Sequence, residues 1–260
     1  MAAPRFFHLQ LPPSGEVVLS DSEARHASKV LRLAAGAEIV LFDGQGGEAS
    51  GTITALNKRS VVVEIETRTD SNRELAQSLE LVVALPKGDR QKTLVEGLVQ
   101  LGVTRLTPLV CQRGVAQPTA TALERLERSV VESSKQCGRN QLMHISPPMV
   151  ISQVLQSSTE QSTTLSLVAH PYGPATSLAA MDHEFSSQII AARIAVGPEG
   201  GFSDVEISQW LEAGWQCVEL GPRLLRVEMA ALQLAAWWAC YSELRKKAGD
   251  PCEPPAIFLS

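Results

Sequence analysis

The loop GPEGG at 197–201 combines residue types that suit the binding of a nucleoside. Its glycines would let a ligand approach the backbone closely. Pro198 lacks the N–H that a phosphate would use, and Glu199 would repel a pyrophosphate. A dinucleotide is therefore disfavoured, and the ribose-binding acid of a Rossmann motif is missing as well. A phosphate-free nucleoside with a positive centre, such as S-adenosylmethionine, fits better, with a plain tight turn as the structural alternative.

A second loop, LGPRLLRVE at 220–228, brings two arginines and a glutamate together before a long apolar stretch. Guanidinium groups donate two parallel hydrogen bonds to phosphates or to base carbonyl oxygens. Arg223 and Arg226 are therefore candidates for contact with a nucleic acid or its base. In the alternative interpretation, Arg226 pairs with Glu228 or Glu219 and only pins the loop.

The elements that must position these loops are predicted strands. Apolar runs at 165–170, 192–197 and 217–220 each precede a loop, the first being AHPYGP at 169–174. In parallel sheets, ligands bind beyond the carboxyl ends of the strands. If these three strands are neighbours, their loops converge on one pocket. We expect His170 in the first loop to be a cofactor contact or a loop residue, and not a base.

The rest of the second half alternates strands with helices, which predicts a parallel α/β sheet covered on both faces. Buried strands are expected at 79–86 and 105–111. Helices are expected at 89–102, 121–138, 203–214 and 228–247. Capping boxes at Thr121 with Glu124 and at Ser203 with Glu206 mark two helix starts.

The first 70 residues are mainly strand-like, with runs at 38–43, 49–56 and 60–69 separated by tight turns. Val61, Val63 and Ile65 alternate as in a half-buried strand. A helix at 20–33 is expected to start with a capping box of Ser20 and Glu23. This pattern predicts a small barrel or sandwich. A polar linker at 69–78 separates a domain at 1–72 from a second at 73–260.

Composition narrows the class of protein. The net charge of −5 argues against a generally basic nucleic-acid binder, but residues 86–139 carry nine basic and five acidic residues. That excess indicates either a footprint for a polyanion or ordinary scatter on helix surfaces. The five cysteines are odd in number and form no C-x-x-C, so we expect no zinc site, no disulfide framework and a cytoplasmic location. No signal peptide or membrane span is expected.

Several segments together resemble one known family. AVGPEGGFSDVEI at 195–207, followed by LGPRLLRVEMAAL at 220–232, is similar to the signature of the bacterial 16S ribosomal RNA uridine-N3 methyltransferases, the RsmE family of the SPOUT superfamily. The segments at 25–44, 84–115 and 130–145 are similar to that family too. The resemblance covers the chain except its last dozen or so residues. Val227 and Met229 stand where members often carry threonines.

The resemblance implies a PUA-like β-barrel followed by a SPOUT α/β domain with a trefoil knot at about 165–235. It also implies a homodimer with its active site near the subunit interface, and methylation of N3 of a uridine in the decoding region of 16S ribosomal RNA, with S-adenosyl-L-methionine as cofactor. No membrane or metal partner is expected. Two alternatives stay open: methylation of another RNA nucleotide, and a non-enzymatic RNA-binding assembly factor.

Roles can then be assigned to residues. As catalytic residues we predict Arg226, aimed at the uracil carbonyl oxygens, and Glu228, which either orients Arg226 or accepts the N3 proton. The predicted cofactor contacts are Ala169, His170, Val196, Gly197, Pro198, Glu199, Gly200, Gly201, Leu220, Gly221, Leu224, Leu225, Arg226, Val227, Glu228 and Ala230. The predicted RNA contacts are Arg5, Lys29, Arg32, Lys87, Arg90, Arg113, Arg139 and Arg223.

Overall fold

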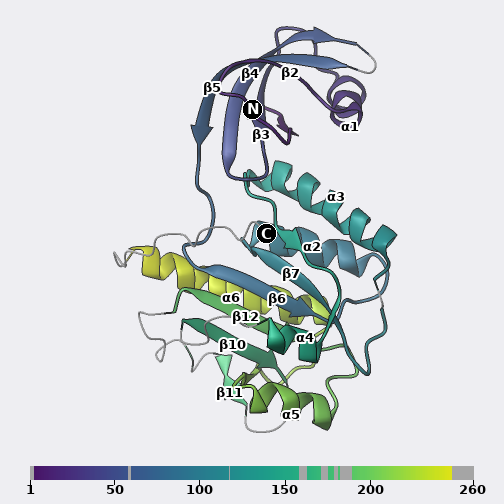
Figure 1. Ribbon diagram of the computed structural model, residues 1–260, viewed down its shortest axis with the longest axis vertical. Coiled ribbons are helices and arrows are strands. Elements are labelled where there is room, and N and C mark those ends of the chain that lie inside the picture. Colours follow the sequence, from purple (N-terminus) through teal and green to yellow (C-terminus); the bar gives the residue numbers. More distant parts are fainter. Residues whose placement is uncertain are drawn as a thin grey trace. The chain divides into compact units, whose positions relative to one another are not determined.

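The computed structural model describes residues 3–57, 60–116, 118–157, 163–170, 175–178, 181 and 189–247 (Figure 1). The chain forms two compact units. One comprises Met1–Glu74 together with Val131–Leu142, and the other comprises Leu75–Val130 together with Met143–Ser260. Within the described helices, none is long and apolar enough to cross a membrane.

The first unit contains a five-stranded sheet in the order β1-β3-β4-β5-β2. β1 pairs with β3 in parallel and the other pairs are antiparallel. The register of β4 against β5 shifts at Ser50/Gly51 and at Ile53/Ala55, and such bulges bend a sheet. The predicted strands are confirmed. The bounds are β1 Arg5–Phe7, β2 Gly15–Val18, β3 Glu38–Phe42, β4 Gly47–Leu56 and β5 Val61–Asp70.

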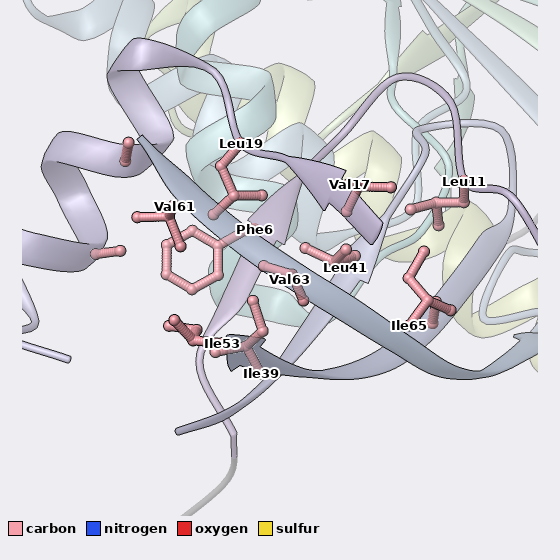
Figure 2. Close-up of a cluster of buried hydrophobic side chains, with 13 residues drawn as sticks. Phe6, Leu11, Val17, Leu19, Ile39, Leu41, Ile53, Val61, Val63 and Ile65 are labelled. Atoms are coloured by element: carbon pink, nitrogen blue, oxygen red, sulfur yellow. The ribbon is translucent and has the colours of Figure 1, made fainter. Parts of the chain in front are cut away.

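The core of this unit is apolar and closely packed (Figure 2). Val61, Val63 and Ile65 all point into it, as their alternation predicts. Phe6 lies beside Val61 and Val63 in the cluster and is fully buried. Burial of a side chain of this size contributes about 1.5–3 kcal/mol to folding.

The first helical segment differs from its prediction at the N-terminus. α1 spans Asp21–Arg25 and continues into a π-helical turn, η1, over His26–Val30. Ser20 makes no side-chain cap, and its Oγ lies 3.1 Å from that of Ser22. The buried carboxylate of Glu23 instead accepts a hydrogen bond from Nζ of Lys135. The predicted capping box is wrong because Glu23 has a stronger, cationic partner.

The second unit contains a parallel sheet in the order β11-β13-β10-β12-β6-β7-β8, with β9 also paired to β7. The predicted parallel sheet is confirmed. The strands are β6 Ser78–Val83, β7 Arg105–Val110, β8 His144–Ile145, β9 Met149–Val150, β10 Thr164–Ala169, β11 Thr176–Ser177, β12 Ala191–Val196 and β13 Gln216–Glu219.

Among the described residues that follow β6, the α-helices are α2 Arg90–Gln100, α3 Ala120–Cys137, α4 Ile151–Gln156, α5 Asp204–Glu212 and α6 Val227–Lys247. The capping box of Ser203 and Glu206 is confirmed at the start of α5. The box predicted at Thr121 is wrong, because α3 already begins at Ala120 and Oγ1 of Thr119 accepts from the backbone N–H of Ala122.

Helices cover both faces of the parallel sheet (Figure 1). Val82, Ala195, Val168 and Cys217 are paired across four neighbouring strands and pack against residues of α4 and α5. α6 packs against β6, β12 and α2. The predicted knot at 165–235 includes residues 171–174, 179–180 and 182–188, which lie outside the described residues, so it stays a prediction.

Candidate active site

Three strand ends meet at one edge of the parallel sheet. β10 lies between β12 and β13, with Ala169 opposite both Val196 and Val218. The backbone N–H of His170 donates to the carbonyl of Val218 at 3.1 Å. The three strands expected to carry the loops are therefore neighbours, and the described parts of the loops start at the same level.

A cavity of about 210 Å³ opens beyond these strand ends. Packing voids in a protein interior rarely exceed the size of a water molecule, so this space is no packing defect. It is lined by all of the predicted cofactor contacts except Arg226 and Glu228. Phe202 and Val218 line it as well, although they were not predicted, and so does Arg223. Position in the chain was the only available signal for Phe202 and Val218: Phe202 directly follows the glycine loop, and Val218 is the last but one residue of β13.

The GPEGG loop is held in a tight conformation. Gly201 has a φ of +67°, a region that favours glycine, and its N–H donates to the carbonyl of Pro198 at 2.8 Å. A Cβ atom on Gly197 would lie 3.0 Å from the ring of Phe202. Glycine is therefore favoured at positions 197 and 201, and at these positions no side chain covers the backbone that faces the cavity.

Two residues that follow β7 form hydrogen bonds with the GPEGG loop and with the first turn of α5. Nη1 of Arg113 donates to the carbonyl of Gly200 at 2.9 Å. The backbone N–H of Gln112 donates to Oε1 of Glu206 at 2.7 Å. Arg113 was predicted as an RNA contact; it is exposed, but at least one of its donors serves this loop.

Glu199 is tied to the first residue of α2. Nη1 of Arg90 donates to its Oε1 at 2.8 Å. Burial raises the pKa of Glu199, but a backbone hydrogen bond, the Arg90 guanidinium and the charge of Arg226 outweigh burial, so the pKa lies below its ordinary value. Glu199 therefore carries a negative charge at the wall of the cavity at neutral pH.

Glu228 lies in the first turn of α6 and is only 7% exposed. Its Oε2 is 3.5 Å from Nη1 of Arg90, and it makes no hydrogen bond to any described residue. Arg226, two positions earlier, is exposed, and the described residues offer it no ion pair with Glu228 or Glu219. The alternative in which Arg226 only pins the loop is therefore not supported.

His170 lines the cavity at the end of β10. Burial lowers the pKa of its imidazole, and the charge of Asp204 only partly offsets that effect. The ring is therefore neutral at physiological pH, which suits a polar wall of the cavity. Within the described residues, no group of three or more His, Cys, Asp or Glu side chains is placed to hold a metal ion.

Besides Arg90 and Arg113, two more of the predicted RNA contacts have internal partners among the described residues. Arg139 is 4% exposed, and its guanidinium donates to both carboxylate oxygens of Glu74. Arg5 donates to Glu48 at 2.6 Å and to the amide oxygen of Asn140. These ion pairs occupy the guanidinium of the buried Arg139 and of the largely covered Arg5, which does not favour contacts of either with phosphates. Lys29, Arg32, Lys87 and Arg223 are exposed, and their RNA contacts stay predictions.

Family models match both parts of the chain. A model of the RNA methyltransferase domain matches residues 73–239. A model of the RNA methyltransferase PUA domain matches residues 19–66. These matches follow the division between the parallel sheet and the barrel-like sheet.

Named relatives and proteins of known structure are similar to this chain over most of their own length. The ribosomal RNA small subunit methyltransferase E of Synechocystis is 31% identical over 215 residues, covering 82% of this chain and 69% of the relative. That of Buchnera aphidicola is 26% identical over 238 residues, covering 90% and 92%. The crystal structure of a ribosomal RNA small subunit methyltransferase E from Neisseria gonorrhoeae, bound to S-adenosyl methionine, superposes with a TM-score of 0.82 at 30% identity and covers 90% of this chain and 96% of that one.

Proposed function

The chain belongs to the ribosomal RNA small subunit methyltransferase E family, and from this premise we propose that it transfers a methyl group from S-adenosylmethionine to N3 of one uridine in the decoding region of 16S ribosomal RNA. The observation that carries the proposal is the cavity where three neighbouring strands end, walled by the GPEGG loop and the residues before α6. Small-subunit ribosomal RNA is the substrate class of the family. The choice of one uridine, and of its N3 atom, is what we propose beyond that class.

The residues at the cavity fit S-adenosylmethionine in their chemistry. Leu220, Leu224, Leu225, Val227 and Ala230 offer apolar surface to an adenine ring. The glycine loop offers backbone groups at close range, and the charge of Glu199 suits a cationic ligand. When bound, the cofactor would supply an electrophilic methyl group on its sulfonium.

Arg226 is the residue we propose for charge stabilisation. Uracil N3 must lose its proton, and the negative charge that results spreads to the O2 and O4 carbonyl oxygens. A guanidinium that donates to these oxygens favours the anionic form and stabilises the transition state. The exposed position of Arg226, without an ion pair among the described residues, leaves its donors available for this contact.

Glu228 is the residue we propose for accepting the N3 proton, directly or through a water molecule. Its Oε2 is buried and accepts no hydrogen bond from a described residue. The Arg90 guanidinium 3.5 Å away offsets part of the cost of burying this carboxylate. We favour this role over the orientation of Arg226, because the described residues show no ion pair between Arg226 and Glu228, whereas Glu228 lies beside Arg90.

We propose that the functional form is a homodimer in the cytoplasm. An apolar groove is lined by residues of α2 and α6 and by residues that flank these helices. They are Gly97 and Gln100 of α2, Leu101 directly after it, Leu225, and Met229, Leu232, Gln233 and Ala236 of α6. Met229 is 53% exposed there, and Leu225 also lines the cavity. A second copy seated in the groove would cover this apolar surface and bring the subunit interface next to the active site.

Methyl transfer with defined substrates tests the function. The chain is incubated with methyl-labelled S-adenosylmethionine and with assembled small subunits, free 16S RNA or transfer RNA. We expect label in small-subunit RNA, recovered as 3-methyluridine. Label in another nucleotide would support the alternative methyltransferase, and cofactor-independent RNA binding without transfer would support an assembly factor. Either result contradicts the proposal.

A further inference from the structure

Arg90 lies between two carboxylates that come from different elements. Its Nη1 is 2.8 Å from Oε1 of Glu199 and 3.5 Å from Oε2 of Glu228. Its charge and the family resemblance predict an RNA contact. The structure instead gives this guanidinium internal partners at the wall of the proposed cofactor site.

Arg226 is the other cation near Glu199. Its neighbours Leu225 and Val227 line the same cavity as Glu199. Its charge also contributes to the lowered pKa of Glu199, which places the two groups within electrostatic reach of each other. Glu199 is therefore a carboxylate on which the charge of Arg226 acts.

We propose that Arg90 is a positioning residue: it occupies Glu199 and thereby leaves the guanidinium of Arg226 available to the substrate. This inference rests on the proposed function, because it takes Arg226 as the catalytic arginine. We therefore expect Arg90 to affect the rate of methyl transfer and not the affinity for RNA.

The solvent exposure of Arg90 and Glu199 allows Glu199 to exchange Arg90 for Arg226 as its partner. Arg90 and Glu199 are about equally exposed, at 34% and 36% of their side chains. A half-exposed ion pair contributes little to overall stability, so its loss should rearrange charges without unfolding the protein.

A double-mutant cycle tests the proposal. The variants are Arg90→Met, Glu199→Gln and their combination, with kcat measured at saturating cofactor. We expect Arg90→Met to lower kcat about tenfold in the wild-type background and by a clearly smaller factor, about threefold, in the Glu199→Gln background. Glu199 can then no longer capture Arg226, and the loss that is left reflects the contact of Arg90 with Glu228. Arg90→Lys should keep Glu199 paired and stay within about threefold of the wild type.

A matched control separates this effect from the loss of any cation on α2. Lys92 lies on the same helix, and its side chain is 67% exposed. Lys92→Met should leave kcat unchanged. Thermal melting of each variant checks that the fold is retained, and Arg90→Lys serves as the test if Arg90→Met does not fold.

Three kinetic results would overturn the inference. They are a higher KM for RNA at unchanged kcat in Arg90→Met, an equal fall in kcat in both backgrounds, and a large fall in folded Arg90→Lys. A crystal structure of Arg90→Met gives a readout that does not depend on activity: we expect Arg226 within ion-pair distance of Glu199, and an unmoved Arg226 contradicts the proposal. If the wild type transfers no methyl group but Arg226 moves in the variant, the proposed function fails, whereas the structural part of the inference, that Arg90 keeps Arg226 away from Glu199, stands.

Discussion

Gly197 and Phe202 are in such close approach that a Cβ atom on residue 197 would lie 3.0 Å from the ring of Phe202. Gly197→Ala must therefore displace either the ring or the backbone that walls the cavity. We predict that the dissociation constant for S-adenosylmethionine rises about tenfold, which corresponds to roughly 1.4 kcal/mol. Calorimetric titration measures it. Adding Phe202→Leu should recover part of the loss, and wild-type affinity in Gly197→Ala would show that the loop does not hold the cofactor.

Arg226 should act on the chemical step and not on cofactor binding. We predict that Arg226→Ala lowers kcat by about 10²–10³, the range for loss of one donor to a developing oxyanion. The affinity for S-adenosylmethionine, measured by calorimetry, should stay within about twofold of the wild type. Near-normal methylation by this variant would remove Arg226 from the mechanism.

Exposed and internal cations of the first unit should differ in their effect on RNA binding. Lys29 and Arg32 are exposed, whereas Arg5 is paired with Glu48. Changing Lys29 and Arg32 together to Gln should reduce the slope of log K against log salt concentration by about 1.5, because each phosphate contact contributes roughly 0.7–0.9. Arg5→Met should leave the slope unchanged and lower the melting temperature. Equal slopes in all three proteins would contradict the assignment of Lys29 and Arg32.

The ion pairs of Glu48 predict a loss of stability in acid. Burial raises the pKa of Glu48, but hydrogen bonds and charge from Arg73 and Arg5 lower it to about 2. Since this value lies below the ordinary 4.5, the contribution to stability is complete above about pH 4.5 and is lost as the pH falls toward 2.

We therefore predict that Glu48→Gln is less stable than the wild type at pH 7 and that the difference shrinks between pH 4.5 and 2. Urea unfolding at several pH values measures this difference. Glu38→Gln, which changes an exposed carboxylate on β3, is the control and should show no such trend. A difference that is constant with pH would mean that the charge of Glu48 contributes nothing.

The groove on α2 and α6 predicts the oligomeric state. Met229 lies in it and is 53% exposed, while Leu244 on the same helix is 68% exposed and lies outside it. Sedimentation should show a dimer for the wild type and for Leu244→Lys, and a monomer for Met229→Lys, because a buried lysine without a partner opposes association. A monomeric wild type, or dissociation by both substitutions, would contradict the proposed interface.

The sequence predicts most of the parallel sheet and, if three of its strands are neighbours, the meeting of their loops. Largely apolar runs such as 79–86 and 192–197 mark buried strands, and their alternation with helices predicts a parallel sheet. The order that puts β10 between β12 and β13 was only a condition of the prediction, because alternation does not fix which strands are neighbours. Strands of two residues, such as His144–Ile145 and Thr176–Ser177, are too short to show any periodicity.

Long-range charge pairing is what the sequence does not reveal. Glu23 has the spacing of a capping box, but Lys135, 112 positions later, recruits its carboxylate. Arg139 has the charge of an RNA contact, but Glu74, 65 positions earlier, holds it in the interior. Local spacing and residue type decide helix starts and surface charge only where no distant partner of opposite charge competes.

Mass-spectrometric mapping of 16S ribosomal RNA from cells with and without the gene tests the central claim most directly. The account predicts 3-methyluridine at one position of the decoding region when the gene is present, and unmodified uridine at that position when it is absent. Complementation with the wild-type chain should restore the methyl group, whereas the Arg226→Ala variant should not. An unchanged level of 3-methyluridine after removal of the gene would contradict the account.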